Sequence, residues 1–464
     1  MARVIILGAG LGGLSTAMLL ARDGHEVTVL ERDPADPPAG RAWESWQRRG
    51  VNQFRLPHFM LARWHAQMAE ELPDVLDELK AAGGLAINVI RALPESLRGR
   101  LRPDDARFDT VTARRPVLEA AVTAVAARTP GVTIRRGVAA TGLCTDPDQR
   151  PARITGVLTE GGRVIRGDLV IDCCGRRSPL ASWLAAVGAR RPYEEREDCG
   201  FVYYGRHFRG TLPEARINLI QNHDSVSVLT LPADNDTWSV VFATSSRDRA
   251  LRGLRDPSTF DAALARYPLA AHWRDGEPIS GVDVMAGIED RYRRLVVDGE
   301  PVVTGVLAVG DAWACTNPSL GRGTSIGLLH ARCLRDLLRE VDPQEHDKLA
   351  RRFDEVTAAA AEPLYRLTVW FDRHRLAEID GDIAGVPYRP DDQRWAISKA
   401  MVPASLADPD VSRGYQAIAS LLTTPAELLA EPGLRERIVE LGGGAEQYPL
   451  PGPDRRELLA AIAG

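Results

Sequence analysis

The pattern of apolar and polar positions predicts that the chain opens with a βαβ unit. Apolar residues fill Arg3–Leu7 and Glu26–Leu30, as in buried strands, whereas Leu11–Arg22 shows an apolar face at helical spacing. A strand, a helix and a second strand in this order are typical of an α/β fold with a parallel sheet. Prolines and a glycine between residues 33 and 40 then mark a loop.

Two helices and several strands are predicted before residue 175. The helices cover Phe59–Ala82, with a break near Pro73, and Pro116–Arg128, where a proline stands in the first turn. The strand-like runs are Val132–Arg135, Ile154–Leu158 and Leu169–Ile171. These elements continue the α/β pattern of the opening unit.

Short apolar runs separated by polar turns predict an antiparallel sheet after residue 200. The runs are Phe201–Phe208, Ile217–Gln221, Val226–Leu231 and Trp238–Ala243. A buried strand, Val302–Val309, and a helix from about Thr324 to Glu340 then resume the first pattern, and the chain from about Gln344 is mainly helical. We therefore predict a nucleotide-binding domain in two parts (residues 1–195 and 286–342), an inserted antiparallel-sheet substrate domain (196–285) and a helical C-terminal region (343–464).

Composition and charge narrow the class of protein. The chain of 464 residues is 44% hydrophobic and 26% charged, which is ordinary for a globular protein in water. Its formal net charge of −5 leaves no basic excess to displace phosphate counterions, which argues against a nucleic-acid partner. The first 20 residues carry a glycine pattern that a signal peptide does not need, and apolar runs are shorter than the roughly 20 residues of a membrane helix. We expect a cytoplasmic protein with no membrane span.

The cysteines predict neither a metal site nor a disulfide framework. Their spacing is not that of metal ligands, and six in a chain of this length are too sparse for a disulfide scaffold. They are Cys144, Cys173, Cys174, Cys199, Cys315 and Cys333. We expect reduced, mostly structural thiols and no bound metal.

A G-x-G-x-x-G fingerprint, Gly8-Ala9-Gly10-Leu11-Gly12-Gly13, lies between the first strand and the first helix. Glycines permit the tight turn and let the backbone approach a pyrophosphate at the helix N-terminus. Glu31 ends the second strand, where a carboxylate accepts hydrogen bonds from ribose hydroxyls and disfavours the 2′-phosphate of NADP. We predict that a dinucleotide binds this turn, Glu31 and the neighbouring Arg32; the alternative is a glycine turn that only packs the helix.

A second pattern distinguishes FAD from NAD. The run Val306–Ala312 leads into Asn317–Thr324, and this pair resembles the Gly-Asp motif of flavoprotein monooxygenases with the p-hydroxybenzoate hydroxylase fold. The resemblance implies that Asp311 binds the ribityl chain of FAD and that Pro318 lies beside the isoalloxazine ring. The following helix would then point its N-terminus at the flavin N1/O2 edge, where reduced flavin is anionic. The same turn supplies three further predicted FAD contacts, Gly321, Gly323 and Thr324.

Smaller matches support the same resemblance. The run Asp172–Pro179 is similar to the Asp-Gly motif region of that family, with Asp172 and Gly175 as predicted FAD contacts; Cys173 replaces the usual glycine, which weakens the case for a nicotinamide contact there. Arginines stand where the family places them near FAD, and their planar guanidinium suits pyrophosphate and ribityl oxygens. These are Arg48 and Arg115, and Val138 is a further predicted contact, to adenine.

The resemblance implies a Rossmann-like FAD-binding domain of the glutathione-reductase type and an FAD-dependent monooxygenase. Such an enzyme uses a flavin C4a-hydroperoxide to epoxidise or hydroxylate a small organic molecule with O2, and the chain looks most like bacterial natural-product epoxidases and hydroxylases. Because the cofactor performs this chemistry, no catalytic side chain is identified; Trp313 and Pro318 are candidates to face the flavin or the substrate, and Trp313 is equally expected in the core. The electrons come from NAD(P)H or from a partner flavin reductase.

Other proteins share this architecture. A flavin-dependent halogenase is disfavoured because the chain has no W-x-W-x-I-P segment. A reductase of isoprenoid double bonds, similar to geranylgeranyl reductase, stays open. From a different class, a prenyl-type binding protein that has lost FAD is disfavoured by the intact fingerprint, Glu31 and Asp311.

Overall fold

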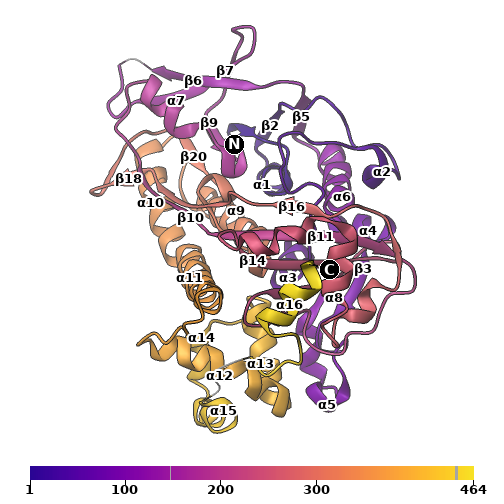
Figure 1. Ribbon diagram of the computed structural model, residues 1–464. Coiled ribbons are helices and arrows are strands. Elements are labelled where there is room, and N and C mark those ends of the chain that lie inside the picture. Colours follow the sequence, from indigo (N-terminus) through magenta and orange to yellow (C-terminus); the bar gives the residue numbers. More distant parts are fainter. Residues whose placement is uncertain (147, 445–447, 464) are drawn as a thin grey trace.

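The computed structural model describes residues 1–146, 148–444 and 448–463. A parallel sheet with the strand order β20-β9-β1-β2-β5 lies in the upper half of the view in Figure 1. The strands are β1 (Arg3–Leu7), β2 (Glu26–Glu31), β5 (Val132–Arg136), β9 (Leu169–Asp172) and β20 (Val306–Ala308). Strands β1, β9 and β20 are almost entirely apolar because both faces of the sheet are covered there, whereas the edge strand β5 alternates half-buried and exposed residues.

Helices cover one face of the parallel sheet. They are α1 (Leu11–Arg22), α6 (Arg115–Arg128) and α9 (Gly323–Glu340), against which α3 (Ala62–Glu71), α4 (Pro73–Ala81) and α10 (His346–Ala360) pack. Side chains from alternate strand positions, such as Ile6, Val29 and Ile171, are buried in this layer together with Leu118 and Leu334 of the helices. This alternation is the period-2 geometry of a strand.

An antiparallel sheet covers the opposite face. It consists of β6 (Ala140–Asp146), β7 (Arg153–Thr159) and β8 (Val164–Arg166). Ile154 and Val157 are buried against Ile5, Leu30 and Val170 of the parallel sheet. The outer strands are largely half-buried or exposed and carry no strong apolar period, so the apolar pattern predicts the β7 region and misses β6 and β8.

A second antiparallel sheet lies between β9 and β20 in the chain, as predicted. Its order is β12-β13-β14-β11-β15, with β16 also paired to β11. The strands are β11 (Phe201–Arg209), β12 (Ile220–Asn222), β13 (Ser227–Pro232), β14 (Thr237–Ser245), β15 (Glu277–Pro278) and β16 (Asp283–Met285). One face packs on α8 (Pro257–Leu264) and α16 (Arg455–Ala463), through Tyr204, Phe242 and Phe260, while Tyr203, Leu231 and Val241 point to the other side.

A short sheet, β10 (Tyr193–Asp198), β17 (Glu289–Arg294) and β21 (Ala314–Cys315), joins the two large sheets. The predicted strand Val302–Val309 is too long, since β20 covers Val306–Ala308. Gly305 has φ +74°, and a Cβ there would lie 2.3 Å from the Ile154 carbonyl oxygen. The chain therefore turns at Gly305 and enters the sheet only after it.

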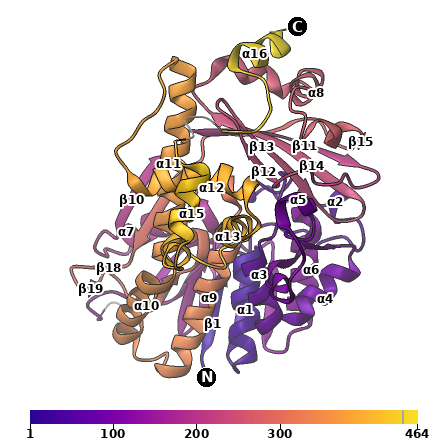
Figure 2. The ribbon, with the colours of Figure 1, turned by 90° about the horizontal axis from the view of Figure 1, so that it is seen from below.

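Helices form the C-terminal region, as predicted. They include α11 (Glu362–Ala384), α12 (Gln393–Ala407), α13 (Pro409–Ala419), α14 (Pro425–Leu429) and α15 (Leu434–Gly442). The last four share a small core that contains Met401, Val411 and Ile438. Both views place α13 beside α5 (Glu95–Arg98), so this region returns to the first third of the chain (Figures 1 and 2).

The remaining elements are short: α2 (Ala42–Ser45), β3 (Leu85–Asn88), β4 (Asp109–Thr112), α7 (Leu180–Ala186), β18 (Val296–Val297) and β19 (Glu300–Pro301). Across the described ranges, we find no helix that combines the length and the apolar character needed to cross a membrane.

Candidate cofactor and substrate cavity

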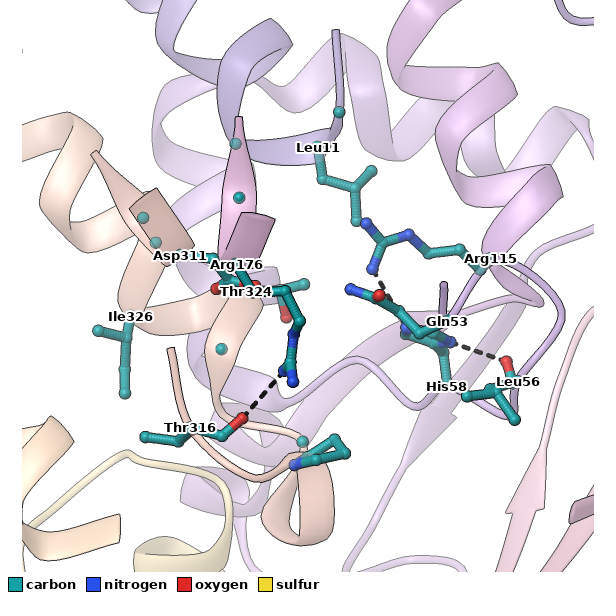
Figure 3. A pocket seen from close by; sticks show the side chains of 18 of the residues that line it. Leu11, Gln53, Leu56, His58, Arg115, Arg176, Asp311, Thr316, Thr324 and Ile326 are labelled. Atoms are coloured by element: carbon teal, nitrogen blue, oxygen red, sulfur yellow. Dashed lines mark hydrogen bonds between the residues drawn. The ribbon is translucent and has the colours of Figure 1, made fainter. Parts of the chain in front are cut away.

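A cavity of about 570 Å³ lies where the carboxyl ends of β1, β9 and β20 face the second antiparallel sheet. Leu7, Cys173 and Val309, at or just after these strand ends, line it. The glycine turn after β1 and the turn before α9, about 300 residues apart in the chain, line the same cavity (Figure 3). Ligands of open α/β sheets bind outside the carboxyl ends of the strands, so this is the candidate site.

Most of the predicted cofactor-binding residues line this cavity. They are Gly8, Gly10, Leu11, Gly12, Glu31, Arg32, Arg48, Arg115, Val138, Gly175, Asp311, Pro318, Gly321, Gly323 and Thr324, together with Trp313. Two predicted contacts, Gly13 and Asp172, are not among the lining residues. The structure thus brings together segments from both parts of the predicted nucleotide-binding domain.

The glycine turn is closely packed on one side and open on the other. A Cβ on Gly13 would lie 1.9 Å from the Gly8 carbonyl oxygen, so Gly13 serves the contact between helix and strand and does not reach the cavity. Gly8 has φ +100° and faces the Cys173 backbone in the same way. Around Gly10 and Gly12, by contrast, a Cβ would meet no heavy atom within 4 Å. Helix α1 also begins with no side-chain cap and no acid in its first turn, which leaves backbone N–H groups for an anion.

Asp172 is fully buried within its own turn, which explains why it misses the cavity. Its carboxylate accepts hydrogen bonds from the Cys174 backbone N–H at 2.9 Å and from the Ser178 hydroxyl. It therefore shapes the turn Gly175–Arg177, whose residues do line the cavity. Sequence position at the end of a strand predicts the turn correctly but not the direction of the side chain.

A buried chain of alternating charges lies beside the nucleotide end of the cavity. The Glu31 carboxylate accepts a hydrogen bond from the Ala9 N–H at 2.9 Å and forms an ion pair with Arg48. Arg48 also forms an ion pair with Glu119, to which Arg115 Nε donates a hydrogen bond at 2.5 Å. Burial alone would raise the pKa of Glu119, but the Arg115 and Arg48 guanidiniums outweigh it and hold the pKa below its ordinary value. Both arginines line the cavity: Arg48 is held between two carboxylates of the protein, and Arg115 extends into the cavity (Figure 3).

His58 supports Arg115 as an uncharged partner. Its Nδ1 lies 2.9 Å from the Leu56 carbonyl oxygen and its Nε2 lies 3.1 Å from Arg115 Nη1. A carbonyl only accepts, so Nδ1 carries the hydrogen and Nε2 accepts from the guanidinium. Burial, assisted by the neighbouring Arg115, lowers the pKa of His58 to about 3, which keeps the ring neutral.

The Asp311 turn is held to the Gly175 turn by arginines that the sequence analysis missed. Arg291, on β17, donates to the carbonyl oxygens of Arg176 at 2.8 Å and of Asp311 at 2.9 Å. Arg293, two residues further on the same strand, donates to the Ala312 carbonyl at 3.0 Å and to the Ser178 hydroxyl at 3.1 Å. A strand as rich in charge as Glu289–Arg294 has the composition of a surface strand, so no local pattern marks Arg291 and Arg293 as buried.

The turn before α9 rests on buried polar groups. Ser319 donates to Asp372 Oδ1 at 2.6 Å, and the Asn317 N–H donates to Asp290 at 2.7 Å. Burial raises the pKa of Asp372 to about 7 and that of Asp290 to about 6. Helix α9 itself begins with no capping side chain and no acid in its first turn, so the partial positive charge of its N-terminus stays available to a ligand.

Trp313 lies at the edge of the cavity but is mainly a core residue. It is 5% exposed, and its ring centroid lies 4.6 Å from that of His330 and 5.8 Å from that of Tyr292. These contacts fix the indole in an aromatic cluster. The geometry therefore favours the core interpretation of Trp313 over direct contact with a substrate.

The remainder of the cavity has a different character. The second antiparallel sheet, the segment after β3 and helix α13 line it with apolar or uncharged side chains. They are Tyr203, Ile217, Asn218, Leu219, Ile220, Leu229, Leu231, Val241, Met285, Val89, Leu93, Tyr415, Gln416, Ala419 and Ser420. We refer to this part as the chamber. Such a lining suits an apolar ligand that is oriented by a few polar groups.

Comparison with known proteins gives a family match over most of the chain. Residues 1–366 match the family model described as an FAD binding domain. Protein Rv3254 of Mycobacterium tuberculosis is 28% identical over 410 residues, which cover 81% of this chain and 81% of that protein. Aklavinone 12-hydroxylase RdmE of Streptomyces purpurascens is 38% identical over 111 residues, 24% of this chain and 18% of that enzyme.

A solved structure shares the fold. PqsL of Pseudomonas aeruginosa, described as a probable FAD-dependent monooxygenase, matches with a TM-score of 0.61 at 19% identity, over 83% of this chain and 98% of that chain.

Proposed function

Because the chain belongs to the FAD binding domain family, we propose that it is an FAD-dependent monooxygenase that epoxidises or hydroxylates a small, largely apolar organic molecule. FAD is its cofactor, which confirms the resemblance drawn from the sequence. One observation carries the proposal: the glycine turn and the Asp311–Thr324 segment line one continuous cavity that opens into an uncharged chamber. The names of RdmE and PqsL, a hydroxylase and a probable FAD-dependent monooxygenase, point the same way.

The residues present fit FAD. The open backbone at Gly10 and Gly12, next to the uncapped start of α1, suits a pyrophosphate. Glu31 lies at the ribose position of the fingerprint. Asp311 lies beside the start of α9, since a Cβ on Gly323 would be 3.8 Å from Asp311 Oδ1. We propose that Asp311 binds the ribityl hydroxyls and that Pro318 and the turn after it face the flavin ring.

Bound FAD, once reduced, supplies the reaction with O2 that delivers an electrophilic oxygen atom. The protein's part is electrostatic and steric. The N-terminus of α9 stabilises negative charge near the turn Pro318–Gly323, and the apolar wall of Leu229, Leu231 and Val241 excludes water from the chamber. Arg115 offers a fixed guanidinium, because Glu119 and the neutral His58 hold it on both sides.

The electron donor and the location in the cell belong to the same proposal. We propose that NAD(P)H reduces FAD directly or that a partner flavin reductase delivers electrons, and that the protein acts in the cytoplasm. Purified protein reduced by NADH or NADPH under anaerobic conditions distinguishes the two routes, because direct reduction bleaches the flavin absorption without a second protein.

The decisive experiment is oxygen consumption with product analysis. Purified, FAD-loaded protein with a reductant is presented with a panel of aromatic and polycyclic compounds, and the product is identified by mass with 18O2. We expect an added mass of one 18O atom. A halogenated product that requires halide would contradict the proposal and favour the halogenase, and a saturated double bond without O2 uptake would favour the reductase. If the purified protein cannot be loaded with FAD at all, the FAD-free binding protein is favoured instead.

A further inference from the structure

The chamber is lined without charge. Every Asp, Glu, Lys or Arg among the described lining residues comes from the nucleotide side of the cavity or the turns around Gly175 and Asp311; these are Glu31, Arg32, Arg48, Arg115, Arg176, Arg177 and Asp311. An anionic or cationic substrate would lose its hydration in the chamber without gaining an ion pair. Uncharged ligands are therefore favoured.

Besides the hydroxyls of Tyr203, Tyr415 and Ser420, two carboxamides supply polar groups to the chamber. Asn218, before β12, and Gln416, on α13, both line the cavity and are 9% and 8% exposed. Gln416 Nε2 donates to Asn218 Oδ1 at 2.7 Å. Within the described ranges the other amide groups of this pair have no protein hydrogen-bond partner, so one carbonyl oxygen and N–H donors stay available. If both side-chain amides are flipped, the pair still has one free carbonyl oxygen and free N–H donors, because the two residues then exchange the roles of donor and acceptor.

Helix α13 holds Gln416 in a fixed position. Arg413 forms a buried ion pair with Asp105 at 2.7 Å and donates to the Arg98 carbonyl oxygen at 2.6 Å. A Cβ on Gly414 would lie 2.9 Å from Leu428, which shows how closely α13 packs against its neighbour α14. These contacts fix α13 as one wall of the chamber.

We propose that the Asn218–Gln416 pair is the specificity element of the chamber, and that it selects an uncharged apolar substrate carrying a hydroxyl group. A hydroxyl both donates and accepts, so it satisfies the free carbonyl oxygen and a free N–H of the pair together. A buried polar group left unpaired is costly, which makes the pair discriminate against an analogue that lacks the hydroxyl. This inference rests on the proposed function of the chamber as the substrate site.

Equilibrium binding tests the inference without turnover. Three probes of equal ring size, 1-naphthol, naphthalene and 1-naphthoate, are titrated into the FAD-loaded protein while the flavin absorption spectrum is recorded. We expect 1-naphthol to bind roughly tenfold more tightly than naphthalene, the loss of about one buried hydrogen bond, and 1-naphthoate to bind most weakly. A preference for 1-naphthoate, or equal affinities for 1-naphthol and naphthalene, would overturn the proposal.

Variants assign the preference to the pair. In Gln416→Leu and, separately, Asn218→Leu, the ratio of the two affinities should fall toward one while FAD content stays that of the wild type, which shows that the site is folded. Asp410→Asn, on the same helix but exposed and paired to Arg102 at the surface, is the matched control and should keep the ratio. An unchanged ratio in both leucine variants would assign the preference to other residues and overturn the inference. These binding measurements need no oxygenation. The hydroxyl preference can therefore be disproved while O2 consumption still supports the proposed function, and the proposed function can be disproved while the hydroxyl preference is observed.

Discussion

The two halves of the cavity are built on opposite principles. The nucleotide half contains a buried chain of charges, Glu31, Arg48, Glu119 and Arg115, and two glycines, Gly8 and Gly13, that leave no room for a Cβ. The chamber is lined by uncharged groups from the inserted sheet and α13 across the described part of the chain. The nucleotide half must match one ligand atom by atom, whereas the chamber needs mainly shape and exclusion of water. Substitutions should therefore separate cleanly into those that affect FAD and those that affect the substrate.

The largest effect is expected at Gly13. Gly13→Ala places a Cβ 1.9 Å from the Gly8 carbonyl oxygen, which must push α1 away from β1 and should cost roughly 3 kcal/mol. We expect FAD to be lost from the purified protein and the melting temperature to fall. The flavin-to-protein absorbance ratio and a thermal melt measure both. Gly12→Ala, where a Cβ meets no atom within 4 Å, is the stability control; a normal FAD content in Gly13→Ala would contradict the packing role.

The second largest effect is expected at Asp311. Asp311→Ala removes a carboxylate from the FAD side of the cavity, and losing charge-assisted hydrogen bonds to the ribityl chain should weaken FAD binding roughly 10- to 100-fold. Titration of the apoprotein with FAD, followed by flavin fluorescence, gives the affinity. Asp311→Asn keeps an acceptor oxygen and should lose less. Unchanged flavin occupancy in the alanine variant would show that Asp311 does not hold the cofactor.

A smaller loss is expected from Arg291→Lys. Lysine keeps the charge but cannot reproduce the fork that bridges the carbonyl oxygens of Arg176 and Asp311. The Asp311 turn should loosen, and FAD affinity should fall roughly tenfold. Arg294→Lys, on the same strand but paired with Asp354 at a more exposed position, is the matched control. Equal FAD affinities in the two variants would mean that the hydrogen bonds of Arg291 do not position the Asp311 turn.

The smallest effect concerns pH. Burial raises the pKa of Asp372 from 3.8 to about 7, so the folded protein holds a proton that the unfolded chain releases. This stabilisation is complete below the unfolded pKa and is lost as the pH rises through about 7. In Asp372→Asn, the melting temperature should vary less between about pH 5 and pH 8. Thermal melts at a series of pH values measure this dependence, with Asp410→Asn as the control. If the melting temperature changes equally with pH in Asp372→Asn and in the wild type, Asp372 does not hold a proton in the folded protein.

The comparison also explains what the sequence could predict. Strand β1, helix α1 and the glycine turn were predicted to the residue, because a tight turn against a pyrophosphate demands glycines at fixed spacing. The predicted cofactor agrees with the family match, and the predicted fold class agrees with the parallel sheet, the inserted antiparallel sheet and the C-terminal helices. The individual FAD contacts stay predictions, supported by their place around one cavity.

Functional residues outside local motifs could not be predicted from the sequence. Arg291 acts through backbone carbonyls of distant turns, which carry no residue preference that a sequence pattern can reveal. Asn218 and Gln416 are 198 positions apart, and each is an ordinary polar residue in its own segment. Their pairing depends on how the C-terminal helices dock, and no periodicity reports that.

The contact between Arg413 and Asp105 spans 308 positions, so it can form only after most of the polypeptide has been synthesised. The groups that line and support the nucleotide half are all present once α11, which carries Asp372, has been synthesised, whereas the chamber gains its last wall only when α13 follows. We expect a chain cut before α13 to acquire flavin yet leave it open to solvent, so that reducing equivalents pass to O2 without any organic product. The distal helices would then act as the protein's safeguard against wasteful turnover.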